Sequence, residues 1–376
     1  MVNITKSRLA GERRYFKELK RRDKKHSYST VKSFHNRHGQ ETLLIAIPTN
    51  FSIYDVDYYF SQSLKLIDTL DKTSDKNQIT KIILDFSNAD SLKAAAVVLL
   101  YATIEVLITQ HGKQIRLINY THSKGLKTVI RESGIDKLCR GFIPSNYFSE
   151  SYMPVISGVG GCFREEIVDF IMQKIYANNM DALLENKYSS AVQEAILNVN
   201  AHAYTDNEDK QWWVICSYLK NSNQLYLVIY DRGMGIPAST RNGHECVDEL
   251  DFSLDETKHF FEIMKTEVGD KITIEQAQDL LKQSSINEYL SDAGIIYASM
   301  IAGATRRLEK SEEIKHGQGS VSIKNLVKSN EHGILWIYSN FGLVKYKGGC
   351  SKNYETIDLP KRIRGTLIQW NIEVTV

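Results

Sequence analysis

The sequence predicts an α/β protein with two folded domains, and three observations lead to this prediction. Apolar strands alternate with helices between residues 40 and 142. Between residues 163 and 376, a long amphipathic helix precedes a pair of apolar strands joined by a polar turn. A segment rich in proline and glycine, residues 143–162, separates these two parts and is expected to be a linker. Residues 1–39 precede them as a basic arm.

The composition excludes several classes of protein. A chain of 376 residues with 42% hydrophobic and 24% charged residues is typical of a soluble globular protein. No apolar segment is long enough to span a bilayer, and no secretory signal follows Met1, so we expect a cytoplasmic protein without membrane contact. The five cysteines are scattered without metal-ligand spacing, which favours reduced thiols over a zinc site.

The charge is distributed unevenly. Residues 1–40 contain twelve lysines and arginines against three acidic residues, whereas the remainder carries 35 basic and 42 acidic residues. A basic arm on a slightly acidic body suggests a nucleic acid or an acidic partner, with residues 6–25 as the contact. The alternative is a solvated, partly helical N-terminus that packs on the acidic surface of the body, because no base-stacking aromatic residues accompany the charge.

The first domain is expected to contain six elements in alternating order. Hydrophobic periodicity and the breakers Gly112 and Gly134 define them. They are a strand at 41–48, a helix at 55–70, a strand at 82–86, a buried helix at 92–108, a strand at 115–118 and a helix at 123–133.

This order of elements resembles the STAS fold of anti-sigma-factor antagonists. The resemblance rests on the strand 82–87, the long helix after it, and the segment 112–117. The phosphorylated serine of that family would fall near Ala94, where this chain has no hydroxyl group. The resemblance therefore implies a fixed docking or dimerising module rather than a substrate of a kinase, and it makes a homodimer plausible.

The second domain is expected to begin its functional part with a helix at 189–204. Glu194, Asn198 and His202 recur every four residues along one side of this helix, opposite an apolar face. The amide oxygen of Asn198 suits a magnesium ion, and the carboxylate of Glu194 can orient or deprotonate a nucleophile. Taken alone, the same pattern also describes the solvent-exposed side of an amphipathic helix.

Three further segments carry polar or glycine-rich patterns. Asp231, Gly233 and Gly235 follow the second of two strands, 212–218 and 225–230, that are joined by a polar hairpin loop. Gly317, Gln318 and Gly319 precede the apolar helix 321–327 and can expose backbone N–H groups to an anion. Thr366 enters the last strand of the chain after a glycine.

These four segments in this order resemble the GHKL ATPase superfamily, whose Bergerat fold packs helices on a mixed, largely antiparallel sheet. The resemblance implies ATP and Mg²⁺ as ligands. It makes Glu194 the catalytic acid, Asn198 the magnesium ligand and Asp231 the contact to adenine, supported by Thr366. Gly233 and Gly235 would shape the adenine pocket. The remaining nucleotide-contacting residues would be His202, Gly317, Gln318 and Gly319.

The chain also departs from the family pattern. Ser320 stands where a leucine usually follows the second glycine motif, and about eighty residues separate the two glycine motifs. Helical stretches at 256–267, 274–282 and 286–302 lie in between, so residues 238–316 are expected to form an extended lid over the nucleotide.

Three functional hypotheses follow. The first is a magnesium-dependent ATPase whose lid state regulates a partner protein, favoured by the glutamate at position 194. The second is a serine/threonine kinase of the anti-sigma type, favoured by the sequence His202-Ala203-Tyr204. The third is a non-catalytic protein that binds nucleic acid or protein through its basic arm.

Overall fold

The protein is an α/β protein whose chain divides into two compact units, 1–146 and 147–376. The computed structural model describes residues 31–35, 40–54, 56, 58–142, 149, 151–160, 164–205, 208–242, 254–282, 289–301, 319–328, 330–349 and 354–374. The basic segment 6–25 lies outside these residues. No helix among them is long and apolar enough to cross a membrane.

The N-terminal unit is built on a four-stranded mixed sheet in the order β1-β2-β4-β6. β1 is antiparallel to β2, whereas β2, β4 and β6 run parallel. Its elements are β1 (Val31–His35), β2 (Glu41–Ala46), β3 (Asn50–Phe51), α2 (Tyr58–Asp71), β4 (Ile79–Asp85), β5 (Ser91–Leu92), α3 (Ala94–Thr109), β6 (Gln114–Ile118), α4 (Lys124–Glu132) and α5 (Ile135–Cys139).

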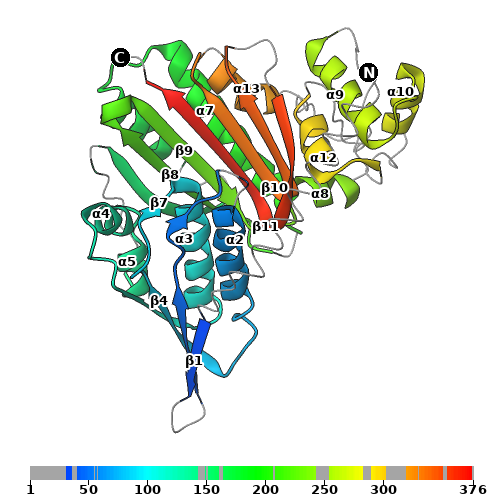
Figure 1. The fold of residues 1–376 in the computed structure, drawn as a ribbon. Helices are drawn as coiled ribbons and strands as arrows, with labels where there is room; N and C mark the ends of the chain where they lie inside the picture. The colour runs from blue at the N-terminus through cyan, green and yellow to red at the C-terminus, as the bar shows by residue number, and fades with distance from the viewer. Residues whose placement is uncertain are drawn as a thin grey trace. The chain divides into compact units, whose positions relative to one another are not determined.

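The six expected elements of this unit are present, and the structure adds β1, the short β3–β5 pair and α5. α3 is buried over almost its whole surface because its sequence is apolar on every side. α2, by contrast, is amphipathic and buries one face, and it packs against α3 (Figure 1). Ala94, where the STAS resemblance places a serine, is the first residue of α3.

The C-terminal unit is built on a five-stranded sheet in the order β10-β11-β9-β8-β7. Every pairing in this sheet among the described strands is antiparallel, so the parallel pair implied by a mixed sheet is not found there. Its elements are β7 (Tyr152–Val159), α6 (Arg164–Phe170), π-helix η1 (Ile171–Ile175), α7 (Ala182–Asn198), π-helix η2 (Val199–Ala203), β8 (Gln211–Leu219), 3₁₀-helix η3 (Lys220–Ser222), β9 (Gln224–Asp231), α8 (Ile236–Asn242), α9 (Asp255–Glu267), α10 (Ile274–Lys282), α12 (Asp292–Ser299), α13 (Gly319–Lys328), β10 (Ile334–Lys347) and β11 (Tyr354–Glu373).

Helices α7 and α13 lie side by side on one face of this sheet (Figure 1). Their apolar residues form the main core with alternate residues of the strands, such as Val214, Ile229 and Ile368. Residues on the opposite face, including Trp213, Val228 and Tyr230, are buried as well. Both faces of the sheet are therefore apolar, as expected for strands that read as continuous hydrophobic runs.

The segment expected to be a linker is partly a strand. Residues 152–159 form β7, an edge strand paired with β8, and so the loop interpretation of this stretch is wrong. Pro154 lies where the register shifts between Met153 and Ile156, a position at which an edge strand tolerates proline. A Cβ on Gly158 would lie 2.4 Å from the ring of Trp212, so this glycine permits close packing and does not make a turn.

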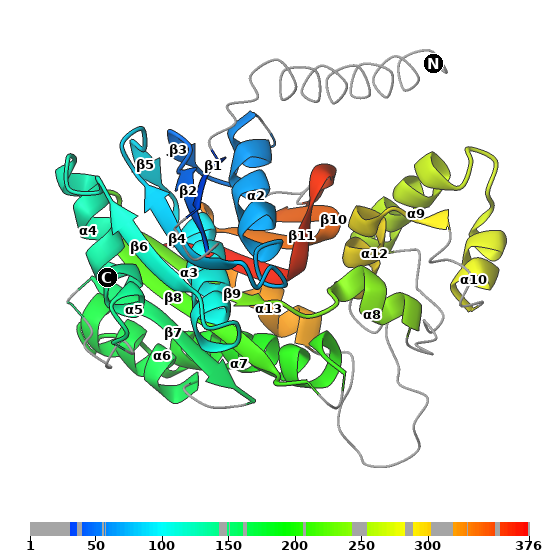
Figure 2. The same ribbon diagram turned by 90° about the horizontal axis from the view of Figure 1, so that it is seen from below.

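The segment between the two glycine motifs contains a helical insertion, which we define as α8, α9, α10 and α12. The first of these, α8, was not expected from the sequence. Both views of the ribbon show the four helices gathered beside the β10–β11 hairpin (Figures 1 and 2). Side chains of α9 and α12, including Phe260, Met264 and Ile296, belong to the core of the unit. α12 is shorter than the expected helix 286–302, of which residues 289–301 are described.

Candidate functional site

Glu194 and Asn198 lie one turn apart near the end of α7. The side chain of Asp181 caps the start of this helix by accepting a hydrogen bond from Leu184 N at 2.7 Å, which explains why α7 begins earlier than the expected residue 189. Apolar residues of the helix face the core, and Glu194 and Asn198 are half-buried. The spacing expected for these two residues is therefore present.

The position of His202 on the helix differs from the one that a regular α-helix would give it after Glu194 and Asn198. After Asn198 the helix changes to a π-helix, η2, which contains His202 and ends at Ala203. A π-helix has more residues per turn than an α-helix, so His202 is rotated relative to the line through Glu194 and Asn198. The sequence repeat predicted the helix correctly but not its wider last turn.

The turn after β9 lies directly against the end of η2. Met234 N donates to the carbonyl oxygen of Ala203 at 2.7 Å, and a Cβ on Gly233 would lie 2.0 Å from the same oxygen. Only glycine fits at position 233 without displacing backbone. The structure therefore joins the Asp231 turn to the helix that carries Glu194 and Asn198.

Gly235 meets the paired strands β10 and β11. It has φ +85°, and a Cβ there would lie 2.7 Å from Ser339 Oγ and 3.0 Å from Gly365 O. Ser339 Oγ accepts a hydrogen bond from Ile236 N at 2.9 Å, and Asn340 Nδ2 donates to Met234 O at 3.1 Å. The turn is thus held on both sides by polar groups of β10.

A bulge between β10 and β11 places these groups. The register moves from Ser339↔Thr366 to Asn340↔Ile363, which leaves Arg364 and Gly365 as extra residues on β11. Gly365 has φ +74°, and a Cβ there would lie 2.0 Å from the carbonyl oxygen of Asp231. Strand β11 can therefore approach the Asp231 turn closely at this point.

Asp231 and Thr366 are adjacent, as the expected adenine contact requires. The carboxylate of Asp231 accepts hydrogen bonds from the backbone N–H groups of Gly233, at 2.9 Å, and Thr366. Thr366 Oγ1 and Ser339 Oγ are 3.1 Å apart. Burial raises the pKa of Asp231 to about 7, and the two N–H groups lower it only in part.

The second glycine motif is only partly described. Gly317 and Gln318 lie outside the described residues. Gly319 is the first residue of α13, which packs against α7. The start of α13 therefore belongs to the same helical layer as Glu194 and Asn198.

The sequence analysis assigned no contact to several polar residues that lie around the turn. Tyr204 Oη accepts from Arg232 N at 2.9 Å and donates to Gln211 O at 2.7 Å, and Arg364 Nε donates to Arg232 O at 3.1 Å. Ser339 and Asn340 were missed as well. The signal for these two is present in the sequence, because two polar residues interrupt the apolar run 334–344 and so indicate a bulge.

The residues present fit a magnesium ion held mainly by phosphate. Among the described residues there is no group of three or more His, Cys, Asp or Glu side chains that could hold a metal by themselves. Mg²⁺ commonly takes one or two protein oxygens and completes its shell with phosphate and water. The amide oxygen of Asn198, with the Glu194 carboxylate one turn away, offers a donor set of this kind.

No protein-family model matches this chain, and no curated protein matches it in sequence.

Proposed function

We propose that this chain binds ATP with Mg²⁺ and hydrolyses it slowly, and that the state of its helical insertion regulates a partner protein. The observation that carries the proposal is the meeting of three separate segments at Asp231. Gly233 lies against Ala203, and Gly365 and Thr366 lie against Asp231 itself. Glycine stands at each point where a side chain would strike backbone.

The buried carboxylate gives this end of the site its selectivity. Asp231 is 4% exposed, and its neighbours are backbone N–H groups rather than a counter-ion. An ionised carboxylate accepts hydrogen bonds, and the exocyclic amino group of adenine donates them. Asp231 is therefore the residue expected to distinguish adenine from a base that presents a carbonyl at that position.

The α7 helix connects this end of the site to Asn198 and Glu194, the residues proposed to bind magnesium and to activate water. Asn198 precedes Ala203 by five residues and Glu194 precedes it by nine, so both lie further from the Asp231 turn along this continuous helical segment. Bound magnesium would offset the phosphate charge, with Asn198 as a ligand. Glu194 would orient a water molecule towards the terminal phosphate and accept its proton.

Measurement of MgATP binding and phosphate release tests the proposal. We expect Glu194→Ala to retain MgATP binding and to lower phosphate release by about 100-fold or more, since a general base contributes at least that much. Asn198→Ala should weaken binding in the presence of magnesium.

Gln193→Ala is the matched control, because Gln193 is exposed and precedes Glu194 on α7. It should behave as wild type in both measurements. If the wild-type protein binds no ATP in the presence of magnesium, the proposed function is wrong.

A further inference from the structure

A buried lysine of α13 forms an ion pair with the helical insertion. Lys324 Nζ is 2.8 Å from Glu256 Oε2, and the side chain of Lys324 is 6% exposed. Glu256 belongs to the first turn of α9. An ammonium group at this depth needs a counter-charge, so the pair ties α9 to α13.

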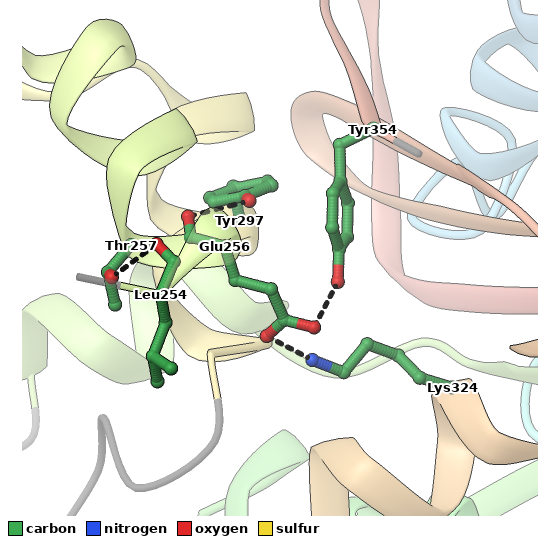
Figure 3. Close-up of polar contacts among 6 residues, drawn as sticks. All are labelled: Leu254, Glu256, Thr257, Tyr297, Lys324 and Tyr354. Carbon is green, nitrogen blue, oxygen red and sulfur yellow. Dashed lines mark hydrogen bonds and ion pairs between the residues drawn. The ribbon is translucent and has the colours of Figure 1, made fainter. Parts of the chain in front are cut away.

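Two tyrosines complete this contact, which we call the Glu256 cluster (Glu256, Tyr297, Lys324 and Tyr354). Tyr354, the first residue of β11, donates from its hydroxyl group to Glu256 Oε1 at 3.1 Å. Tyr297 of α12 donates to the carbonyl oxygen of Glu256 at 3.0 Å. Figure 3 shows the carboxylate of Glu256 between Lys324 and Tyr354, so that both of its oxygens have partners.

The Lys324 side of the cluster is buried and aromatic, whereas the side chain of Glu256 is 36% exposed. The rings of Tyr297 and Tyr354 are 4.7 Å apart, and Tyr346 lies 4.8 Å from Tyr354. Burial lowers the pKa of Lys324, while Glu256 acts in the opposite direction. Removing the Glu256 carboxylate therefore leaves the Lys324 ammonium group buried without a counter-charge, whereas a Glu256 carboxylate left alone stays in contact with water.

The position of Lys324 connects the cluster to the proposed nucleotide site. α13 begins at Gly319 of the second glycine motif and packs against α7, which carries Glu194 and Asn198. A second bond fixes the same helix, because Trp370 Nε1 of β11 donates to Ile323 O at 2.9 Å. α13 is thus the element through which the insertion can act on the phosphate end of the site.

We propose that Glu256 and Lys324 are positioning residues, which fasten the helical insertion to α13 so that the insertion and the phosphate end of the site respond to nucleotide together. This inference rests on the proposed function and adds to it the contact through which the insertion and the nucleotide influence each other. Such a coupling is reciprocal: nucleotide should order α9, and loosening α9 should weaken nucleotide binding.

Amide hydrogen exchange of the full-length chain, with and without MgATP, tests whether the Glu256–Lys324 pair fastens α9 to α13. The substitution Glu256→Gln changes a residue of α9, but it should speed hydrogen exchange of the amides of α13. The reason is that it leaves the Lys324 ammonium group buried without a counter-charge. Lys324→Met lies on α13 but should speed exchange in α9. In the double variant Glu256→Gln/Lys324→Met, the amides of α13 should exchange more slowly than in Glu256→Gln alone, because the buried ammonium group without a counter-charge has been removed.

Lys258→Gln is the matched control. Lys258 pairs with Asp255 in the same turn of α9 at 3.6 Å, but both side chains are mostly exposed. Loss of this exposed ion pair should leave the hydrogen exchange of the α13 amides unchanged. Tyr354→Phe removes one hydrogen bond to Glu256 and serves as a milder test should Glu256→Gln fold poorly.

Kinetics test the link to nucleotide. The KM for ATP should rise about tenfold in Glu256→Gln, and kcat should change by less than about twofold, because the pair positions α13 and does not touch Glu194. MgATP should slow exchange in α9 of the wild type but not of Lys324→Met.

The two proposals fail in different ways. If the wild-type protein binds no MgATP, the proposed function is wrong, and exchange without nucleotide still decides whether the pair fastens α9 to α13. If the wild type binds MgATP but each single variant speeds exchange only in its own helix, with an unchanged KM, the inference is wrong and the proposed function stands.

Discussion

At the scale of single residues, ionisation of the buried carboxyl group of Asp231 should lower the stability of the fold and strengthen ATP binding. Its pKa in the folded protein is about 7, against 3.8 as its ordinary value. Between these two values the folded state binds more protons than the unfolded state. The free energy of unfolding therefore falls as pH rises from about 4 to about 7. ATP binding should follow the opposite course, because the ionised form is the better acceptor for the amino group of adenine.

Asp231→Asn should separate these two effects. An asparagine cannot ionise, so the variant should be more stable than wild type at pH 8 by roughly 2 to 4 kcal/mol, and this difference should shrink towards pH 4. Urea unfolding at a series of pH values measures it. A difference that stays constant across the series would contradict the assignment of the raised pKa to Asp231.

The same variant should bind ATP weakly at every pH, whereas binding by wild type should strengthen as pH rises through about 7. Glu267→Gln is a suitable comparison. Glu267 is another carboxyl whose pKa is raised by burial, and it accepts hydrogen bonds from Ser291 N and Oγ, within the insertion. Its variant should retain the pH dependence of ATP binding.

At the scale of elements, the approach of β11 to the Asp231 turn depends on glycine. Gly365→Ala would combine a strained backbone, at φ +74°, with a Cβ 2.0 Å from Asp231 O. We expect the free energy of unfolding to fall by about 3 kcal/mol or more and ATP affinity to fall with it.

Gly141→Ala is a control that introduces backbone strain at a positive φ without a steric clash of the Cβ. Gly141 has φ +80°, and nothing lies within 4 Å of a Cβ built there. This variant should lose only about 1 kcal/mol and keep ATP binding. If the two substitutions had equal effects on denaturant unfolding, close approach of the backbone would not explain the glycine at 365.

The elements that the sequence predicted well are those with a strong hydrophobic period. The apolar face of α7 and the continuous apolar residues of β8 and β9 were located from such patterns. β7 was missed because Pro154 and Gly158 usually indicate a loop, whereas here an edge position and the ring of Trp212 account for them. The end of α7 was predicted as regular because no residue pattern announces a π-helix.

The candidate site was predictable in its residue types but not in its junctions. The sequence placed Asp231, Gly233 and Gly235 after a strand, and the structure adds that Gly233 meets Ala203 and that Gly235 meets Ser339. Such contacts join residues about thirty and about a hundred positions apart. They depend on strand order and on a register shift, which local periodicity does not encode.

At the scale of the whole molecule, the division into two units predicts how nucleotide affects unfolding. All expected ATP-contacting residues belong to the unit 147–376. A ligand present at about 100 times its Kd adds about 2.7 kcal/mol to the stability of the state that binds it. In calorimetry, MgATP should raise the transition temperature of the C-terminal unit, and Asn198→Ala should reduce this shift. An equal shift in that variant would place the nucleotide elsewhere.

The irregular pairing of β10 with β11 has a consequence for intermolecular strand pairing. β10 is the edge strand of its sheet and has 14 residues, long enough to recruit a strand from another molecule. At Phe341, however, the backbone N–H group donates to Asp292 Oδ2 at 2.9 Å, and α12 packs on the strand. A second register shift, between Asn340 and Gly342, thus interrupts the row of hydrogen-bonding groups that would otherwise template intermolecular aggregation.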